Sequence, residues 1–170
     1  MLARMQRGLL GASALAMVAA FGCVMAGVVG RPLGWSLPGL DAYAGYAIAA
    51  ALFLALPEAL RRDRHIRVTL LAQRLPGGAQ RALEALCVAA GGGIAGLLAW
   101  SALRLAWQSQ RMHDVSAAAD ATPLWLPQLA MAAGCAGLAI AFLQAAWRMA
   151  RGRPALEAPA TGAGEREHAE

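Results

Sequence analysis

The sequence contains no lysine and has little charge of either sign. Its 170 residues include 15 basic residues, all arginine, and 10 acidic ones, so 15% of the chain is charged while 59% is hydrophobic. A soluble domain is about one-quarter charged, and the mean hydropathy of +0.49 indicates a membrane protein instead. The pI is near 10.1, but the arginines lie in short gaps between apolar runs. This distribution argues against a nucleic-acid partner.

Residues that carry chemistry are also scarce. Cys23, Cys87 and Cys135 each lie inside an apolar run without CxxC spacing, which favours apolar packing over a disulfide framework or a zinc site. The histidines all lie outside the apolar runs, so no facing pair for haem is predicted. No Asp, Glu, His, Lys or Arg lies in the middle of an apolar run, although catalysis or ion transport in a membrane normally needs such a residue. We therefore expect no catalytic residue, no cofactor and no metal, and no enzyme activity.

Four apolar runs are long enough to cross a bilayer, which takes about 20 residues. They cover about 9–29, 40–60, 83–103 and 124–147. The first resembles a signal peptide, but its length of about 21 residues exceeds a secretory core of about 7–15. Segments this rich in Ala and Leu satisfy their backbone groups as helices. We predict an all-α membrane protein with a four-helix transmembrane domain over 1–153 and a disordered cytoplasmic tail over 154–170.

The arginines predict the orientation of these spans. Twelve arginines precede the first span, lie between the second and third, or follow the fourth, whereas three lie on the other side. Cytoplasmic loops collect Arg and Lys, so both termini and the middle loop are expected in the cytoplasm. The stretch ALRRDRHIRV, residues 59–68, concentrates this charge. Each cation adds about 1 kcal/mol near anionic lipid. The expected lipid anchors are Arg61, Arg62, Arg64, His65 and Arg67.

The middle loop is too apolar to be a simple connector. On a helix, Val68, Leu71 and Leu75 form one stripe, and Ile66 and Leu70 form another roughly opposite. A helix that lies on lipid alone needs one apolar face, so two stripes predict a short interfacial amphipathic segment between lipid and a partner protein. A loop that simply continues into the third span is the alternative.

Two motifs in register with the four spans resemble a known family. HIRVTLLAQRLP, residues 65–76, preceded by EALRRDR, is similar to the signature of the small membrane subunit of tripartite ATP-independent periplasmic (TRAP) transporters. WQSQRMHDVSAAADATPLWLPQLAMAAG, residues 107–134, resembles the outer loop of that family. Many relatives carry Asp where Thr69 stands, so no carboxylate role is transferred to that position. The resemblance covers about 40–147.

The resemblance implies a scaffold subunit in the bacterial inner membrane. In such systems a periplasmic binding protein captures an organic acid, and a large multi-span permease subunit imports it with a sodium gradient. The small subunit holds the large one and helps to form the docking surface for the binding protein. Gly92 and Gly96 have the small-xxx-small spacing of a helix contact. The contact is either with a partner protein or with another span of this same chain. Candidate partner contacts are Ile66, Val68, Leu70, Leu71, Gly92, Gly96, Pro123, Trp125 and Pro127.

Two other classes stay open from the sequence. One is a membrane-anchor subunit of a redox enzyme, which haem absorbance in purified membranes would reveal. The other is a stand-alone four-helix exporter, which would function without a partner. Neither has a supporting motif in the chain.

Overall fold

The structure is a computed structural model that describes part of the chain. The described residues are 2–35, 38–62, 77–118 and 121–151. The predicted interfacial segment and the predicted disordered tail lie outside them, and so do Arg64, His65, Ile66, Arg67, Val68, Leu70 and Leu71.

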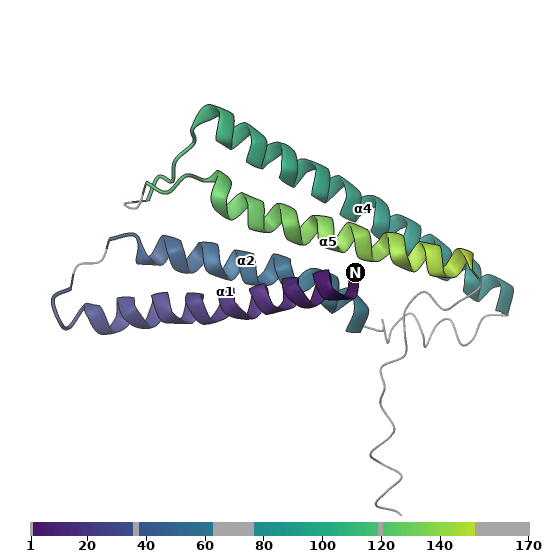
Figure 1. The fold of residues 1–170 in the computed structure, drawn as a ribbon, viewed down its shortest axis with the longest axis horizontal. Coiled ribbons are helices and arrows are strands. Elements are labelled where there is room, and N and C mark those ends of the chain that lie inside the picture. The colour runs from purple at the N-terminus through teal and green to yellow at the C-terminus, as the bar shows by residue number, and fades with distance from the viewer. Residues whose placement is uncertain (1, 36–37, 63–76, 119–120, 152–170) are drawn as a thin grey trace, which may run out of the picture.

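Four long helices make up nearly all of the described chain (Figure 1). Each is long and apolar enough to cross a membrane, which confirms the predicted all-α class with four transmembrane helices. Their bounds are α1 Leu2–Gly30, α2 Leu40–Arg62, α4 Gly77–Met112 and α5 Trp125–Ala150.

The helix α4 is longer than its predicted span. It has 36 residues, or about 54 Å at 1.5 Å per residue, whereas the hydrocarbon core is about 30 Å thick. It continues past Leu103 through Arg104, Gln108 and Arg111. These residues end the apolar run, but Arg and Gln are good helix formers, so the helix does not stop there.

The helices lie in one layer rather than in a closed bundle. The substantial contacts join α1 to α2, α2 to α5, and α5 to α4, so the order across the layer is α1–α2–α5–α4 and the edges are α1 and α4 (Figure 1). The described parts of the two connections, 31–35 in one and 113–118 with 121–124 in the other, lie at one end, called here the loop end. At the opposite end, α1 begins and α5 finishes.

Small residues form the seams between neighbouring helices. Ala20, Ala44 and Ala51 are buried where α1 meets α2, and Ser13 Oγ donates a hydrogen bond of 2.7 Å to the Ala51 carbonyl. Between α4 and α5, the buried side chains of Ala102, Ala132 and Cys135 form a cluster. Without a hydrophobic driving force in lipid, small residues let helices approach closely enough for van der Waals packing.

The central seam between α2 and α5 depends on two glycines. A Cβ atom on Gly134 would overlap the backbone carbonyl group of Phe53 and lie 2.9 Å from its Cβ. A Cβ on Gly137 would lie 2.8 Å from Pro57 Cγ and 2.9 Å from Leu9 Cδ1. The absence of side chains at these two positions therefore allows the two halves of the chain to meet.

Candidate partner-binding surfaces

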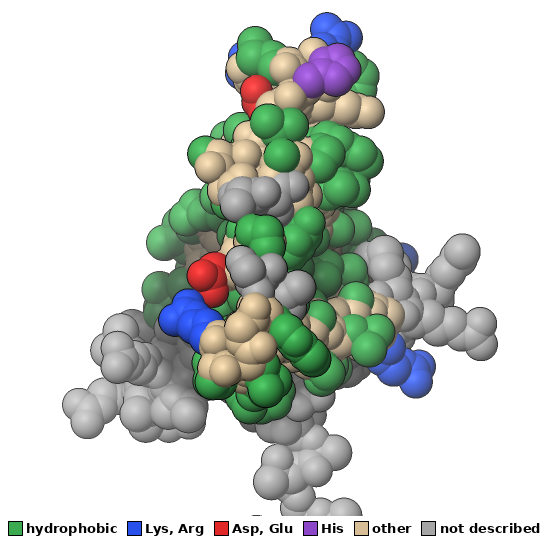
Figure 2. All heavy atoms as spheres, turned by 90° about the vertical axis from the view of Figure 1, so that its left-hand side faces the viewer, with side chains coloured by type: hydrophobic (Ala, Val, Ile, Leu, Met, Phe, Trp, Pro, Cys, Tyr) green, Lys and Arg blue, Asp and Glu red, His purple; other side chains and the backbone are tan. Residues whose placement is uncertain are grey.

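Large apolar side chains cover the outside of the layer. On α1, those of Leu15, Val18 and Phe21 are exposed, and on α4 those of Ile94, Leu97 and Trp100. In Figure 2, which faces the loop end, hydrophobic side chains dominate the described surface and the charged ones lie at separate places. Exposed apolar surface of this extent marks contact with lipid or with other proteins.

The described parts of the loop between α4 and α5, residues 113–118 and 121–124, fold against each other at the loop end. Val115 and Pro123 form an isolated antiparallel bridge. The Ser116 N–H donates to the Thr122 carbonyl over 2.8 Å, and the Leu124 N–H donates to the Asp114 carbonyl over 3.0 Å. The Asp114 N–H in turn donates to the Ser109 carbonyl, 3.0 Å away. The backbone of this loop is thus tied to itself and to the end of α4.

Two tyrosines of α2 hold the same loop. The Tyr46 hydroxyl donates a hydrogen bond of 2.7 Å to Ser116 Oγ, and Thr122 Oγ1 donates one of 3.1 Å to the Tyr43 hydroxyl oxygen. The two rings meet edge to face, with centroids 6.3 Å apart. Because α2 lies in the other half of the chain, these contacts connect the two halves at the loop end. We call Tyr43, Tyr46, Ser116 and Thr122 the loop clamp.

Sequence reasoning did not identify the loop clamp. Ser116 lies within the family motif at residues 107–134, and Tyr43 and Tyr46 lie within the predicted second span. The available signal was the preference of tyrosine for the membrane interface, where the ring packs and the hydroxyl finds a polar partner.

The predicted partner contacts in this region lie at the start of α5 and just before it. Pro123 forms the bridge and is exposed, Trp125 begins α5, and Pro127 lies in its first turn. A proline is tolerated there because the first backbone N–H groups of a helix have no partner within it. The structure brings all three to the loop end, beside the loop clamp.

The two glycines of α4 that were predicted to contact a partner helix, Gly92 and Gly96, have different surroundings. A Cβ on Gly92 would lie 3.5 Å from Phe142 Cβ, so Gly92 packs on α5 of the same chain. Gly96 has no atom within 4 Å of its Cβ position and is exposed. The closest approach to α5 is instead at Gly91, whose Cβ would lie 2.5 Å from Phe142 Cε1.

The expected lipid anchors are described only in part. Arg61 and Arg62 form the last residues of α2, while the other three lie outside the described residues. At the same end of the layer, the Arg151 guanidinium lies 3.8 Å from the ring centroid of Trp147. This stacked pair at the end of α5 combines an aromatic ring with a cation, as is common where a helix leaves the bilayer.

The described part of the chain contains no cluster of three or more His, Cys, Asp or Glu side chains suited to a metal. Cys23, Cys87 and Cys135 are free thiols on three different helices.

Comparison with known proteins yields one match. The family model described as "Tripartite ATP-independent periplasmic transporters, DctQ component" matches residues 20–152, which include the last part of α1 and all of α2, α4 and α5. No curated protein and no solved structure matches the chain.

Proposed function

Because the chain belongs to the DctQ family, the small membrane component of tripartite ATP-independent periplasmic transporters, we propose that it is a non-catalytic scaffold subunit. In this proposal it holds a large multi-span permease subunit during sodium-coupled import of a small organic acid. A periplasmic binding protein delivers the acid.

The single-layer arrangement is the observation that carries this proposal. A carrier must surround its substrate with protein, whereas the substantial contacts among the helices described here join only neighbours in the order α1–α2–α5–α4. Such a layer leaves two broad apolar faces and two edges on which another membrane protein can pack. The family assignment favours this scaffold over a redox anchor or a stand-alone exporter.

The arginine distribution supports an orientation in the inner membrane. We place the loop end at the periplasm and both termini in the cytoplasm, because twelve of the fifteen arginines then lie on the cytoplasmic side. The loop clamp, with Pro123, Trp125 and Pro127, then faces the periplasmic binding protein. At the opposite end, Arg61, Arg62, Arg64, His65 and Arg67 anchor the middle loop to anionic headgroups. Ile66, Val68, Leu70 and Leu71 contact the large subunit.

An affinity pull-down tests the scaffold role. The tagged chain is purified from gently solubilised native membranes, and its partners are identified and quantified by mass spectrometry. We expect stoichiometric recovery of a large multi-span permease. A tagged, unrelated four-span protein from the same membranes serves as the control. Recovery of the chain alone, or with a redox subunit, would contradict the proposal.

A transport assay tests the rest of the mechanism. Proteoliposomes with both membrane subunits and the binding protein should accumulate the acid only with an inward sodium gradient. Omission of this chain should abolish uptake. Uptake by the large subunit alone at the full rate would show that the scaffold is dispensable.

A further inference from the structure

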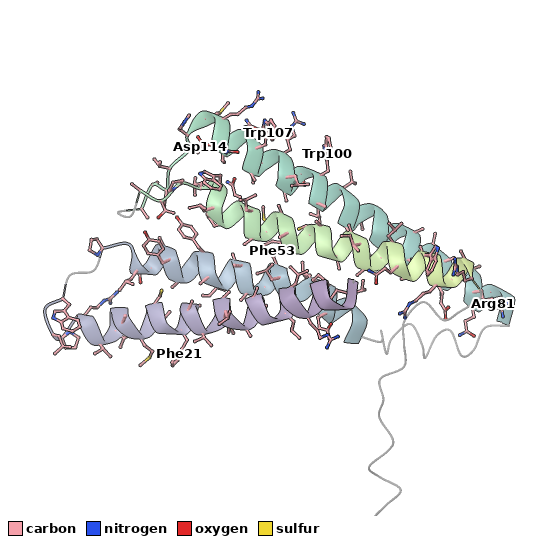
Figure 3. All side chains as sticks on the ribbon, viewed as in Figure 1. Phe21, Phe53, Arg81, Trp100, Trp107 and Asp114 are labelled. Carbon is pink, nitrogen blue, oxygen red and sulfur yellow. The ribbon has the colours of Figure 1, made fainter. Side chains whose placement is uncertain are left out.

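One edge of the layer carries two tryptophans and a cation on a single helical face. Trp100, Arg104 and Trp107 are spaced i, i+4 and i+7 along α4, which places them on the same side. The tryptophans are 70% and 61% exposed, and Arg104 is exposed as well. Both rings point away from α5 and out of the layer (Figure 3).

The packing of α4 on α5 gives the depth of these residues. Ala102 packs with Ala132 and Cys135, and Ala132 lies about 10 Å along α5 from Trp125 at 1.5 Å per residue. The two helices are antiparallel. Measured along the helix axis from the level of Trp125 toward the middle of the membrane, Arg104 therefore lies roughly 7 Å and Trp100 roughly 13 Å away. Trp125 begins α5, and the preference of indole for headgroups makes it the marker of the membrane boundary.

Arg104 and Trp100 are therefore unusual on a surface that faces lipid alone. An arginine within hydrocarbon costs several kcal/mol unless it is paired or reaches the interface, and indole favours the headgroup layer over greater depth. Among the described residues, the side chain of Arg104 takes part in no hydrogen bond, ion pair or ring contact, whereas the nearby Arg111 guanidinium lies 5.1 Å from the Trp107 ring. The structure thus gives Arg104 no internal partner.

The opposite edge of the layer has a different character. The outward face of α1 carries Leu15, Val18, Phe21 and Val28, all exposed, and the chain has no charged residue between Arg7 and Arg31. Phe21 points away from the layer on the far side from the α4 tryptophans (Figure 3). Such a uniform apolar face suits lipid.

We propose that the outward face of α4 binds a transmembrane helix of the large permease subunit, and that a carboxylate of this helix pairs with Arg104. The inference rests on the proposed scaffold function. The α4 docking face consists of Gly93, Gly96, Trp100, Arg104 and Trp107. A partner carboxylate neutralises the guanidinium through bidentate hydrogen bonds. Gly93 and Gly96, with no atom within 4 Å of either Cβ position, let the partner backbone approach beside Trp100.

Paired glycine substitutions test the location of this contact. Gly96→Leu should lower recovery of the large subunit in the pull-down about tenfold or more, because the new side chain fills the space of the partner helix. Gly11→Leu on α1 is the matched control, since Gly11 is also helical and has no atom within 4 Å of its Cβ position. It should leave recovery unchanged. Size-exclusion chromatography of each variant verifies that the protein stays monodisperse.

Charge variants test the ion pair. Arg104→Glu should reduce recovery about tenfold or more, and Arg104→Lys should retain most of it because the charge persists. A photo-crosslinking amino acid at position 100, which leaves the glycines and Arg104 intact, should form an adduct with the large subunit. The same probe at position 21 should form none.

The outcomes distinguish this inference from the proposed function. If the wild-type chain recovers no large subunit, the scaffold function itself fails. If the wild type recovers it while Gly96→Leu and Arg104→Glu behave like Gly11→Leu, the scaffold stands and the α4 docking face is overturned. Loss of bound anionic lipid from Arg104→Glu with full partner recovery would identify lipid as the occupant and would also overturn it.

Discussion

At the scale of single residues, removal of the Tyr46 hydroxyl should weaken the loop clamp. Its hydrogen bond to Ser116 is 2.7 Å long and partly buried, and such a bond contributes about 0.5–1.5 kcal/mol. Tyr46→Phe should lower the apparent Tm in detergent and accelerate amide hydrogen exchange in residues 113–124.

A double-mutant cycle identifies the origin of that effect. Ser116→Ala should cause a somewhat larger loss, because Ser116 Oγ also accepts a hydrogen bond of 3.2 Å from the Ala118 N–H. The double variant should lose little more than Ser116→Ala alone, because both changes remove the bond between Tyr46 and Ser116. Fully additive losses would show that the two side chains act separately.

Gly134 is a second residue at which a single substitution should lower the stability of the protein. Gly134→Ala places a methyl group against the backbone of Phe53, and such overpacking typically costs about 1–3 kcal/mol. We expect a clear decrease in thermal stability. Gly45→Ala on α2 is the control, since Gly45 has no atom within 4 Å of its Cβ position, and it should be neutral or slightly stabilising. Equal stability of the two variants would contradict the close approach of α2 and α5.

At the scale of elements, the segment between α2 and α4 is the part whose role is inferred from sequence alone. If one of its apolar stripes contacts the large subunit, Ile66→Asp with Leu70→Asp should release that subunit in detergent while membrane insertion is kept. Thr69→Asp adds a carboxylate off both stripes and should leave the complex intact. Co-purification, measured by quantitative mass spectrometry, is the readout. Unchanged recovery with the double variant would contradict a contact through Ile66 and Leu70.

The helices and their connections differ in how far sequence predicts them. Hydropathy located all four helices because a bilayer demands about 20 apolar residues in a row. It missed the extension of α4 to Met112, where polar residues end the apolar run but favour helix. It also missed the ordered loop, because the bonds of Ser116 and Thr122 to Tyr46 and Tyr43 span 70 and 79 positions of the chain.

The candidate surfaces, too, were predicted from the sequence only in part. The small-xxx-small spacing selected Gly92 and Gly96 together, yet only Gly92 packs on α5. Spacing alone cannot tell which neighbour a helix face meets, since that depends on the order of helices across the layer. For Pro123, Trp125 and Pro127 the motif predicted a common location, and the structure brings them together at the loop end.

At the scale of the whole molecule, the proposed orientation gives a direct labelling prediction. In a variant without native cysteines, a single cysteine at position 114 should react in intact cells with a membrane-impermeant maleimide once the outer membrane is permeabilised. A cysteine at position 151 should react only after the inner membrane is opened. The reverse pattern would invert the topology and would place the loop clamp in the cytoplasm.

The order of helices across the layer also bears on how the protein is made. Each of the two strongest helix pairs, α1 with α2 and α4 with α5, is consecutive in the chain, so the first hairpin can complete its contacts in the bilayer before α4 leaves the ribosome. The second hairpin then joins it laterally, through the glycine seam of α5 and the loop clamp. Biogenesis thus becomes the association of two preformed hairpins, a two-stage process in which insertion precedes docking. A chain divided within the middle loop and expressed as two pieces would retain every contact described here between the two hairpins.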